Sequence, residues 1–257
     1  MLRRRIIPRI LVNQTKMGYV AVTSRKFNNF IIVGEPLSQF KIMESNKADE
    51  IAIINVTKHN YNNLNSFKTI ISKVVRNSST PISAGGGIKI IDDISLLMDA
   101  GIEKVTIPIK TDMDNIGLIK KASNRYGTQA IQVSLDYYSD NGSYSIRNFH
   151  ESLTLNKLEE IVKAYCSAGA GELLLTNIDR DGSKLGLDFE LFSKIHNLVS
   201  VPIIIAGGAN SSENFSDAFI MGLDGVMTGT YFAKMDHNLL QLRSNMSVKG
   251  INVRASI

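Results

Sequence analysis

The chain has 257 residues, 44% of them hydrophobic and 21% charged, which is enough to bury the core of one large α/β domain or two small ones. No apolar run approaches the ~20 residues that a membrane-spanning helix needs, and the net charge of +5 comes from scattered basic residues. These features argue against a membrane protein and against a nucleic-acid-binding protein. A single cysteine, Cys166, excludes an internal disulfide and fits a reducing, cytoplasmic compartment.

Short β-branched runs alternate along the chain with longer segments of helical period. We expect eight strands, at residues 4–11, 51–56, 81–84, 104–109, 130–136, 172–178, 202–207 and 225–229. Pro8 interrupts the apolar start, which we therefore interpret as the first strand rather than a secretion signal. Between strands, apolar residues recur at i, i+3, i+4 and i+7, as in amphipathic helices. Two longer polar stretches, after the first and fifth strands, could each hold a hairpin.

The second half of the sequence repeats the first. A shift of 121 residues aligns Pro81 with Pro202, Gly86 with Gly207, Gly87 with Gly208, Gly101 with Gly222 and Val105 with Val226. Eight strand–helix units in two similar halves predict a single closed (β/α)8 barrel over residues 1–257, with half-barrels near 1–125 and 126–257. A doubly wound sheet is the alternative, but it usually has fewer strands and one glycine fingerprint.

Glycine-rich turns follow the third and seventh strands directly. Without side chains, these turns let backbone N–H groups approach an anion closely, although a tight turn without a ligand would have the same sequence. After the eighth strand, Gly229 and Thr230 add another small turn, and phosphate sites in such barrels favour the seventh and eighth loops. We therefore expect a phosphate site in the second half. The equivalent place in the first half holds Pro108, which has no N–H to donate.

Asp136 ends the fifth predicted strand and should point into the mouth of the barrel, where the chemistry of this fold occurs. It is a candidate general acid or base, unless it only caps the following hairpin. The residue at the same place in the first half is Leu11, which cannot transfer a proton. Residues 177–188 contain Asp179, Asp181 and Gly182, and predict either a mobile polar loop over the mouth or a solvated turn.

Charged residues begin four of the predicted strands. Two cations and two anions could form a closed ring at the base of the barrel, and their spacing alone favours a salt-bridged plug that stabilises it; they are Arg5, Glu50, Lys104 and Glu172. The four histidines, His59, His150, His196 and His237, are far apart and lack metal-ligand spacing. Cys166 lies on a helical pattern and should face the core. We expect no metal and no cofactor.

Several segments resemble the cyclase subunit of imidazole glycerol phosphate synthase, an enzyme of histidine biosynthesis. They are "RIIP" (5–8), "AGGGI" (84–88), "GAGELLLTNIDRDGSKLG" (169–186), "AGGA" (206–209) and "GINVR" (250–254). The resemblance implies a two-fold-repeated (β/α)8 barrel, a glutaminase partner docked beneath it as a heterodimer, and ammonia passing through the barrel to the top. It also implies that Arg5, Glu50, Lys104 and Glu172 form the ammonia gate, and that Glu103, Gln129 and Arg254 contact the glutaminase.

At the top of the barrel, the resemblance implies that Asp136 is catalytic. It further implies a set of substrate- and phosphate-binding residues: Gly86, Gly87, Thr176, Asp181, Gly182, Gly207, Gly208, Gly229 and Thr230. Other positions depart from the family. Leu11 stands where a second catalytic aspartate belongs, Asn55 replaces an acid, Thr23 replaces a lysine of the mobile first loop, and Pro108-Ile109 replaces Asn-Thr. These departures resemble relatives from bacterial surface-polysaccharide systems, in which ammonia serves to amidinate an acetamido sugar.

Three functions stay open from the sequence. The first is a synthase-type subunit that receives ammonia from a glutaminase and acts on a phosphorylated or nucleotide-linked small molecule in such an amidination. The second is the cyclase reaction of histidine biosynthesis. The third is a non-catalytic barrel that activates the glutaminase and conducts ammonia to a separate ligase.

Overall fold

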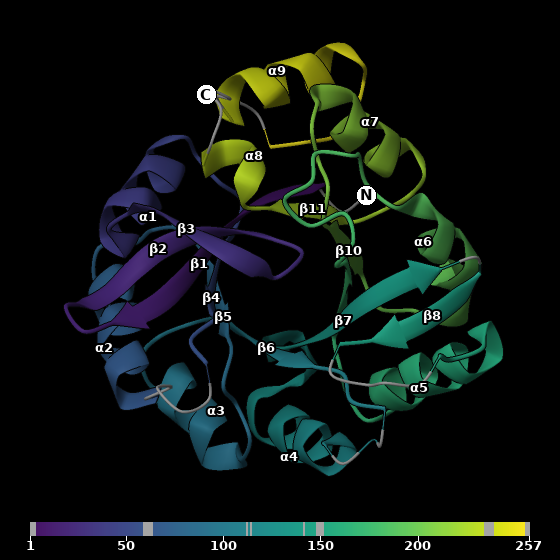
Figure 1. The fold of residues 1–257 in the computed structure, drawn as a ribbon, viewed down its shortest axis with the longest axis horizontal. Coiled ribbons are helices and arrows are strands. Elements are labelled where there is room, and N and C mark those ends of the chain that lie inside the picture. The colour runs from purple at the N-terminus through teal and green to yellow at the C-terminus, as the bar shows by residue number, and fades with distance from the viewer. Residues whose placement is uncertain are drawn as a thin grey trace.

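The computed structural model describes residues 4–58, 64–111, 113, 115–140, 142–147, 152–233 and 239–254. Eight parallel strands close into a barrel (Figure 1). They are β1 (Arg5–Thr15), β4 (Ile51–Asn55), β5 (Ile82–Gly85), β6 (Lys104–Pro108), β7 (Ile131–Asp140), β9 (Glu172–Asn177), β10 (Ile203–Ala206) and β11 (Gly225–Thr228). Pairing of β1 with β11, from Arg5–Gly225 to Pro8–Thr228, closes the ring. The predicted (β/α)8 barrel is confirmed, and an open doubly wound sheet is excluded.

Helices surround the barrel on its outside (Figure 1). They are α1 (Pro36–Ser45), α2 (Leu64–Val75), α3 (Ile91–Met98), α4 (Ile116–Tyr126), α5 (Leu155–Ser167), α6 (Phe189–Ile195), α7 (Ser212–Ile220), α8 (Thr230–Ala233) and α9 (Leu239–Val248), with 3-10 turns at Thr128–Ala130 and His196–Leu198. Within the described ranges, no helix combines the length and apolar character that crossing a membrane would require.

The core has two parts because successive strand side chains point to opposite faces. Outward-facing residues such as Ile53 and Val105 pack in one large cluster with helix residues such as Phe67 and Ile71. A small second cluster fills part of the barrel interior: Ile7, Ala52, Leu174, Ile204, Ala206 and Met227. Cys166 packs against the large cluster, as expected, and burial raises the pKa of its thiol to about 11.

Both predicted hairpins are present. β2 (Gly18–Arg25) pairs antiparallel with β1 and with β3 (Asn28–Gly34), and β8 (Ser143–Ile146) pairs antiparallel with β7. As a result β1 reaches Thr15 rather than Leu11, and β7 reaches Asp140 rather than Asp136. Each strand continues past the barrel because the hairpin supplies a new hydrogen-bonding partner there.

The two-fold repeat extends to backbone packing at equivalent turns. Gly86 and Gly207 have φ of +99° and +94°, a region that disfavours residues with a side chain. A Cβ on Gly86 would lie 2.1 Å from the carbonyl oxygen of Asn55, and one on Gly207 would lie 2.5 Å from that of Asn177. These asparagines end β4 and β9. Each glycine therefore allows a loop to pack against the end of the preceding strand.

Replacing Gly86 with Ala is expected to destabilise the fold by about 2 kcal/mol, because the new Cβ meets backbone and the φ is strained. Gly117 in α4 is the matched control, since nothing lies within 4 Å of a Cβ there; Gly117→Ala should be neutral or stabilise by up to about 1 kcal/mol. Urea unfolding of both variants measures the difference. Equal stabilities would contradict the packing role of Gly86.

Candidate functional site

Alternate side chains on each strand face the barrel interior, so they are stacked from base to mouth. On β1 this series is Arg5, Ile7, Arg9 and Leu11. The corresponding series on β7 is Gln132, Ser134 and Asp136. The sequence therefore places charge at the base of the barrel, mixed apolar and polar groups at mid-height, and Asp136 at the mouth.

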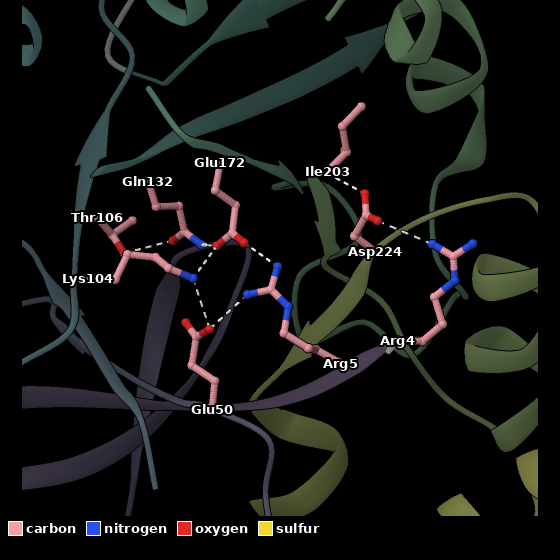
Figure 2. A network of polar contacts seen from close by, with 9 residues as sticks. All are labelled: Arg4, Arg5, Glu50, Lys104, Thr106, Gln132, Glu172, Ile203 and Asp224. Carbon is pink, nitrogen blue, oxygen red and sulfur yellow. Dashed lines mark hydrogen bonds and ion pairs between the residues drawn. The ribbon is translucent and has the colours of Figure 1, made fainter. Parts of the chain in front are cut away.

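Four charged side chains form a closed ring at the base (Figure 2). Arg5 Nη1 lies 3.0 Å from Glu50 Oε2, and Arg5 Nη2 donates to Glu172. Lys104 Nζ lies 3.0 Å from Glu50 Oε2 and 2.8 Å from Glu172 Oε1. Each cation thus bridges both anions, and the formal charges of the ring cancel.

A second layer of polar groups stands next to the ring (Figure 2). Gln132 Nε2 donates to Glu172 Oε1 at 2.6 Å, and Thr106 Oγ1 donates to Gln132 Oε1 at 2.8 Å. Burial by itself would raise the pKa of Glu172, but Lys104 and Arg5 outweigh it and hold that pKa below its usual range. Glu172 is therefore ionised at neutral pH and accepts from three side chains.

At the rim of the base, the same side-chain-to-backbone hydrogen bond occurs in each half of the barrel. Glu103 Oε2 accepts from the backbone N–H of Ile82 at 2.6 Å, and Asp224 Oδ2 accepts from that of Ile203 at 3.0 Å. Asp224 also accepts from Arg4 (Figure 2). In each half, the acid just before one strand binds the first N–H of the preceding strand. Glu103 thus has a structural role whether or not it also contacts a partner.

The three residues expected at a partner interface are exposed at this same rim. Glu103 immediately precedes β6. Gln129 lies in the turn before β7, where its Nε2 donates to Tyr126 O at 3.4 Å. Arg254 follows Val253, which bridges Arg4 at the start of β1.

Asp136 lies at the mouth, where Ser134 Oγ donates to its Oδ1 at 2.5 Å. It pairs in register with Thr176 of β9. Burial raises the pKa of Asp136, against the opposing effects of the Ser134 hydrogen bond and the positive charges of Arg147 and Arg9. A carboxyl with a raised pKa is suited to proton transfer nearer neutral pH. Leu11, at the equivalent place on β1, is buried and apolar, so it adds no second acid.

Gly86 and Gly87 form the turn after β5, and the neighbouring turn after β6 has few donors to offer an anion. Pro108 has no N–H. The N–H of Ile109 donates to Ser134 O at 2.8 Å, and that of Lys110 donates to Tyr165 Oη at 2.9 Å. The chain after β6 therefore has its next two N–H groups engaged within the protein.

The second-half turns line a small hollow that is open to solvent, which we call the second-half cradle. Its lining includes Gly182, Gly207, Gly208, Gly229 and Thr230, together with Arg9, Asp181 and Lys184. All the glycines expected at this site line it, whereas Thr176 lies deeper, beside Asp136.

The loop after β9 is tied down rather than solvated. Asp181 is 2% exposed, and Ser24 Oγ donates to its Oδ2 at 2.7 Å. The N–H of Lys26 donates to the carbonyl oxygen of Asp181 at 2.9 Å. A Cβ on Gly182 would lie 2.0 Å from Ser24 O, so only glycine permits this contact. The loop is therefore anchored to the turn between β2 and β3.

Comparison with known proteins places the chain in a family. The family model described as "Histidine biosynthesis protein" matches residues 5–238. The chain belongs to this family. The imidazole glycerol phosphate synthase subunit HisF of Natranaerobius thermophilus is 33% identical over 258 residues, covering 99% of this chain and 100% of the relative. The HisF subunit of Saccharolobus solfataricus is 34% identical over 238 residues, covering 89% and 91%.

Within this histidine biosynthesis family member, Arg9 is the site residue that sequence reasoning missed. Its Nη2 lies 2.5 Å from Asp181 Oδ1, in the lining of the second-half cradle. The signal was present in the sequence, because Arg9 follows Arg5 by four residues on one strand and must share its inward face. Gln132 was missed as well, although its alternation with Ser134 and Asp136 on β7 places it on the inward face of that strand.

The remaining candidates lie elsewhere or outside the described residues. His196 directly follows α6, and its Nδ1 lies 3.2 Å from Phe192 O. His59, His150 and His237 fall outside the described ranges. Among the side chains that the structure describes, no three His, Cys, Asp or Glu residues group as a metal site would require.

Proposed function

We propose that this chain is a cytoplasmic synthase-type subunit that receives ammonia from a glutaminase at the base of its barrel. The ammonia would be used at the mouth to amidinate a surface-polysaccharide sugar that carries a phosphate or nucleotide. One observation carries the proposal: the four-residue ring at the base is complete, whereas the mouth has Asp136 but Leu11 at the equivalent place, and a cradle in the second half alone. A subunit that keeps the charged ring at the base but has a different set of residues at the mouth would use the same nitrogen source, ammonia, with a different acceptor.

Polar side chains rise from the ring toward Asp136 along one side of the interior. Above Lys104 and Glu172 stand Gln132 and Thr106, and Ser134 connects to Asp136 through its hydroxyl. The opposite side carries the apolar cluster around Ile7 and Met227. A small neutral amine could pass along this polar side of the interior with hydrogen-bonding partners. An ammonium ion would lose its hydration there without a net opposite charge, because the formal charges of the ring cancel.

Opening the ring requires the Lys104 ammonium to leave at least one of its two carboxylates. Docking of a partner on the rim that carries Glu103, Gln129 and Arg254 would supply the energy for that movement. At the mouth, Asp136 would accept a proton from ammonia as its nitrogen bonds to the acetamido carbon, and would return a proton to the amide oxygen, which leaves as water.

The cyclase reaction of histidine biosynthesis is the second candidate, because the identity to HisF subunits extends over the whole chain. Against it stand Leu11 in place of an acid and Pro108 in place of a donor. Cyclisation in the family is expected to need both acids and to hold both phosphates of its substrate.

An assay with ammonium salt, which bypasses the glutaminase, separates the two candidates. The chain is incubated with the bisphosphorylated substrate of imidazole glycerol phosphate synthase, with the Natranaerobius thermophilus subunit as positive control. We expect no turnover, and partial recovery on Leu11→Asp, which restores the second acid. Turnover by the unmodified chain comparable to the control would establish the histidine-pathway reaction instead.

A further inference from the structure

We infer that Arg9 is the charged receptor for a phosphate-class oxyanion in the second-half cradle, and that Asp181 holds its guanidinium there until the anion arrives. This deepens the proposed function, on which it rests for the place of the substrate. It assigns to β1 a binding residue that neither the glycine turns nor the family resemblance indicates.

The first observation is an unpartnered donor. The Arg9 side chain is only 7% exposed, and Nη2 is engaged by Asp181 Oδ1 at 2.5 Å. Its Nε is buried and has no hydrogen-bond partner among the described residues. A buried donor without a partner is costly, so this position favours a ligand atom that would accept from Nε. Guanidinium donors suit phosphate oxygens in particular, because they present parallel N–H groups.

The second observation is where Nε lies. A Cβ built on Gly229 would stand 3.9 Å from Arg9 Nε and 2.9 Å from the Arg9 carbonyl oxygen. The absence of a side chain at Gly229 therefore lets the turn lie close against Arg9. Nε thus adjoins the turn of Gly229 and Thr230, whose residues line the cradle together with Gly207 and Gly208.

The third observation is that the guanidinium is held on its other sides. The second carboxylate oxygen of Asp181 accepts from Ser24, so Asp181 itself is fixed. The centroid of the Phe27 ring lies 6.0 Å from Arg9 Cζ and 4.8 Å from Arg147 Cζ. A purely structural ion pair with Asp181 would account for Nη2 alone. Such an ion pair would not provide a hydrogen-bond acceptor for Nε.

Calorimetric titration of the full chain with inorganic phosphate at low ionic strength tests the inference without any glutaminase or acceptor. Arg9→Gln is expected to weaken phosphate binding tenfold or more, since a hydrogen bond to a charged group is lost. Arg147→Gln is the matched control, because Arg147 contacts the same ring but lies outside the cradle lining; it should bind as the unmodified chain does. Asp181→Asn should tighten binding several-fold, because it frees the guanidinium from its internal carboxylate.

Equal phosphate affinity in Arg9→Gln and the unmodified chain would overturn the inference. So would weaker binding in Asp181→Asn, or no phosphate binding by the unmodified chain tighter than about 10 mM. Far-UV circular dichroism checks that each variant is folded, and Arg9→Lys, which keeps the charge but lacks Nε, gives a second comparison with a smaller loss. If phosphate binds through Arg9 but no glutaminase couples to the chain, this inference stands and the proposed function fails.

Discussion

Replacing Glu172 with Ala is expected to lower the free energy of unfolding by about 3–5 kcal/mol, because it leaves buried cations without their partner. Glu172 is 4% exposed and accepts from Arg5, Lys104 and Gln132. Without it, two cations share the single carboxylate of Glu50. Urea unfolding at neutral pH measures the loss.

Glu160→Ala is the control for Glu172→Ala. Glu160 pairs with Lys157 on the exposed face of α5, with side chains 64% and 51% exposed, and the loss there should stay below about 0.5 kcal/mol. A loss at Glu172 no larger than that at Glu160 would show that the ring contributes nothing to the fold.

The same ring sets the sign of a pH dependence. Because the pKa of Glu172 is held below its unfolded value, its contribution to stability is present above the unfolded pKa of about 4.3. It is lost as the pH falls through the folded pKa. Glu172→Gln removes the titrating group, so its stability should fall less steeply with acid than that of the unmodified chain. An equal loss of stability with falling pH in Glu172→Gln and in the unmodified chain would contradict this role of Glu172.

Replacing Asp136 with Asn is expected to lower nitrogen transfer about 10²–10⁴-fold, because the proton acceptor at the mouth is lost, and to leave glutamine hydrolysis by the partner unchanged. The complex is supplied with glutamine and the small-molecule fraction of a cell extract as the source of acceptor. With the unmodified chain, less ammonia should be released than glutamate formed. With the variant, the two amounts should be equal.

Asp140→Asn serves as control, since Asp140 ends the same strand but is exposed in the hairpin. It should retain coupling. Because burial raises the pKa of Asp136, transfer should fall with acid at a higher pH than an ordinary aspartate would cause. If Asp136→Asn still released less ammonia than the glutamate formed, as the unmodified chain does, the mouth would only conduct ammonia and a separate ligase would carry out the chemistry.

The eight barrel strands were predictable because each is a β-branched run bounded by helical periodicity, and local pattern suffices for such elements. Strand ends were less predictable. β1 and β7 run four residues beyond their expected ends, where pairing with β2 and β8 extends them. The sequence indicated a hairpin after each strand, but not that its first arm would continue the barrel strand itself.

The ring at the base was predictable as a set of charges but not as a geometry. The spacing of Arg5, Glu50, Lys104 and Glu172 places them at strand starts, and closure of the barrel brings them into contact. Burial of Asp181 could not be foreseen, because a polar loop sequence reads as solvated. Its partners, Ser24 and Arg9, lie more than 150 residues away in sequence.

The most direct test of the central claim, that a glutaminase supplies ammonia at the base of the barrel, is co-purification. The tagged chain is purified from cells that naturally contain this chain, and the glutaminase activity that it captures is measured. The captured material should hydrolyse glutamine. Arg254→Glu, at the exposed rim of the base, should abolish the captured activity, and Asp136→Asn, at the mouth, should retain it. Absence of glutamine hydrolysis with the unmodified chain, or equal activity captured by Arg254→Glu, would contradict a glutaminase docked on the base of this barrel.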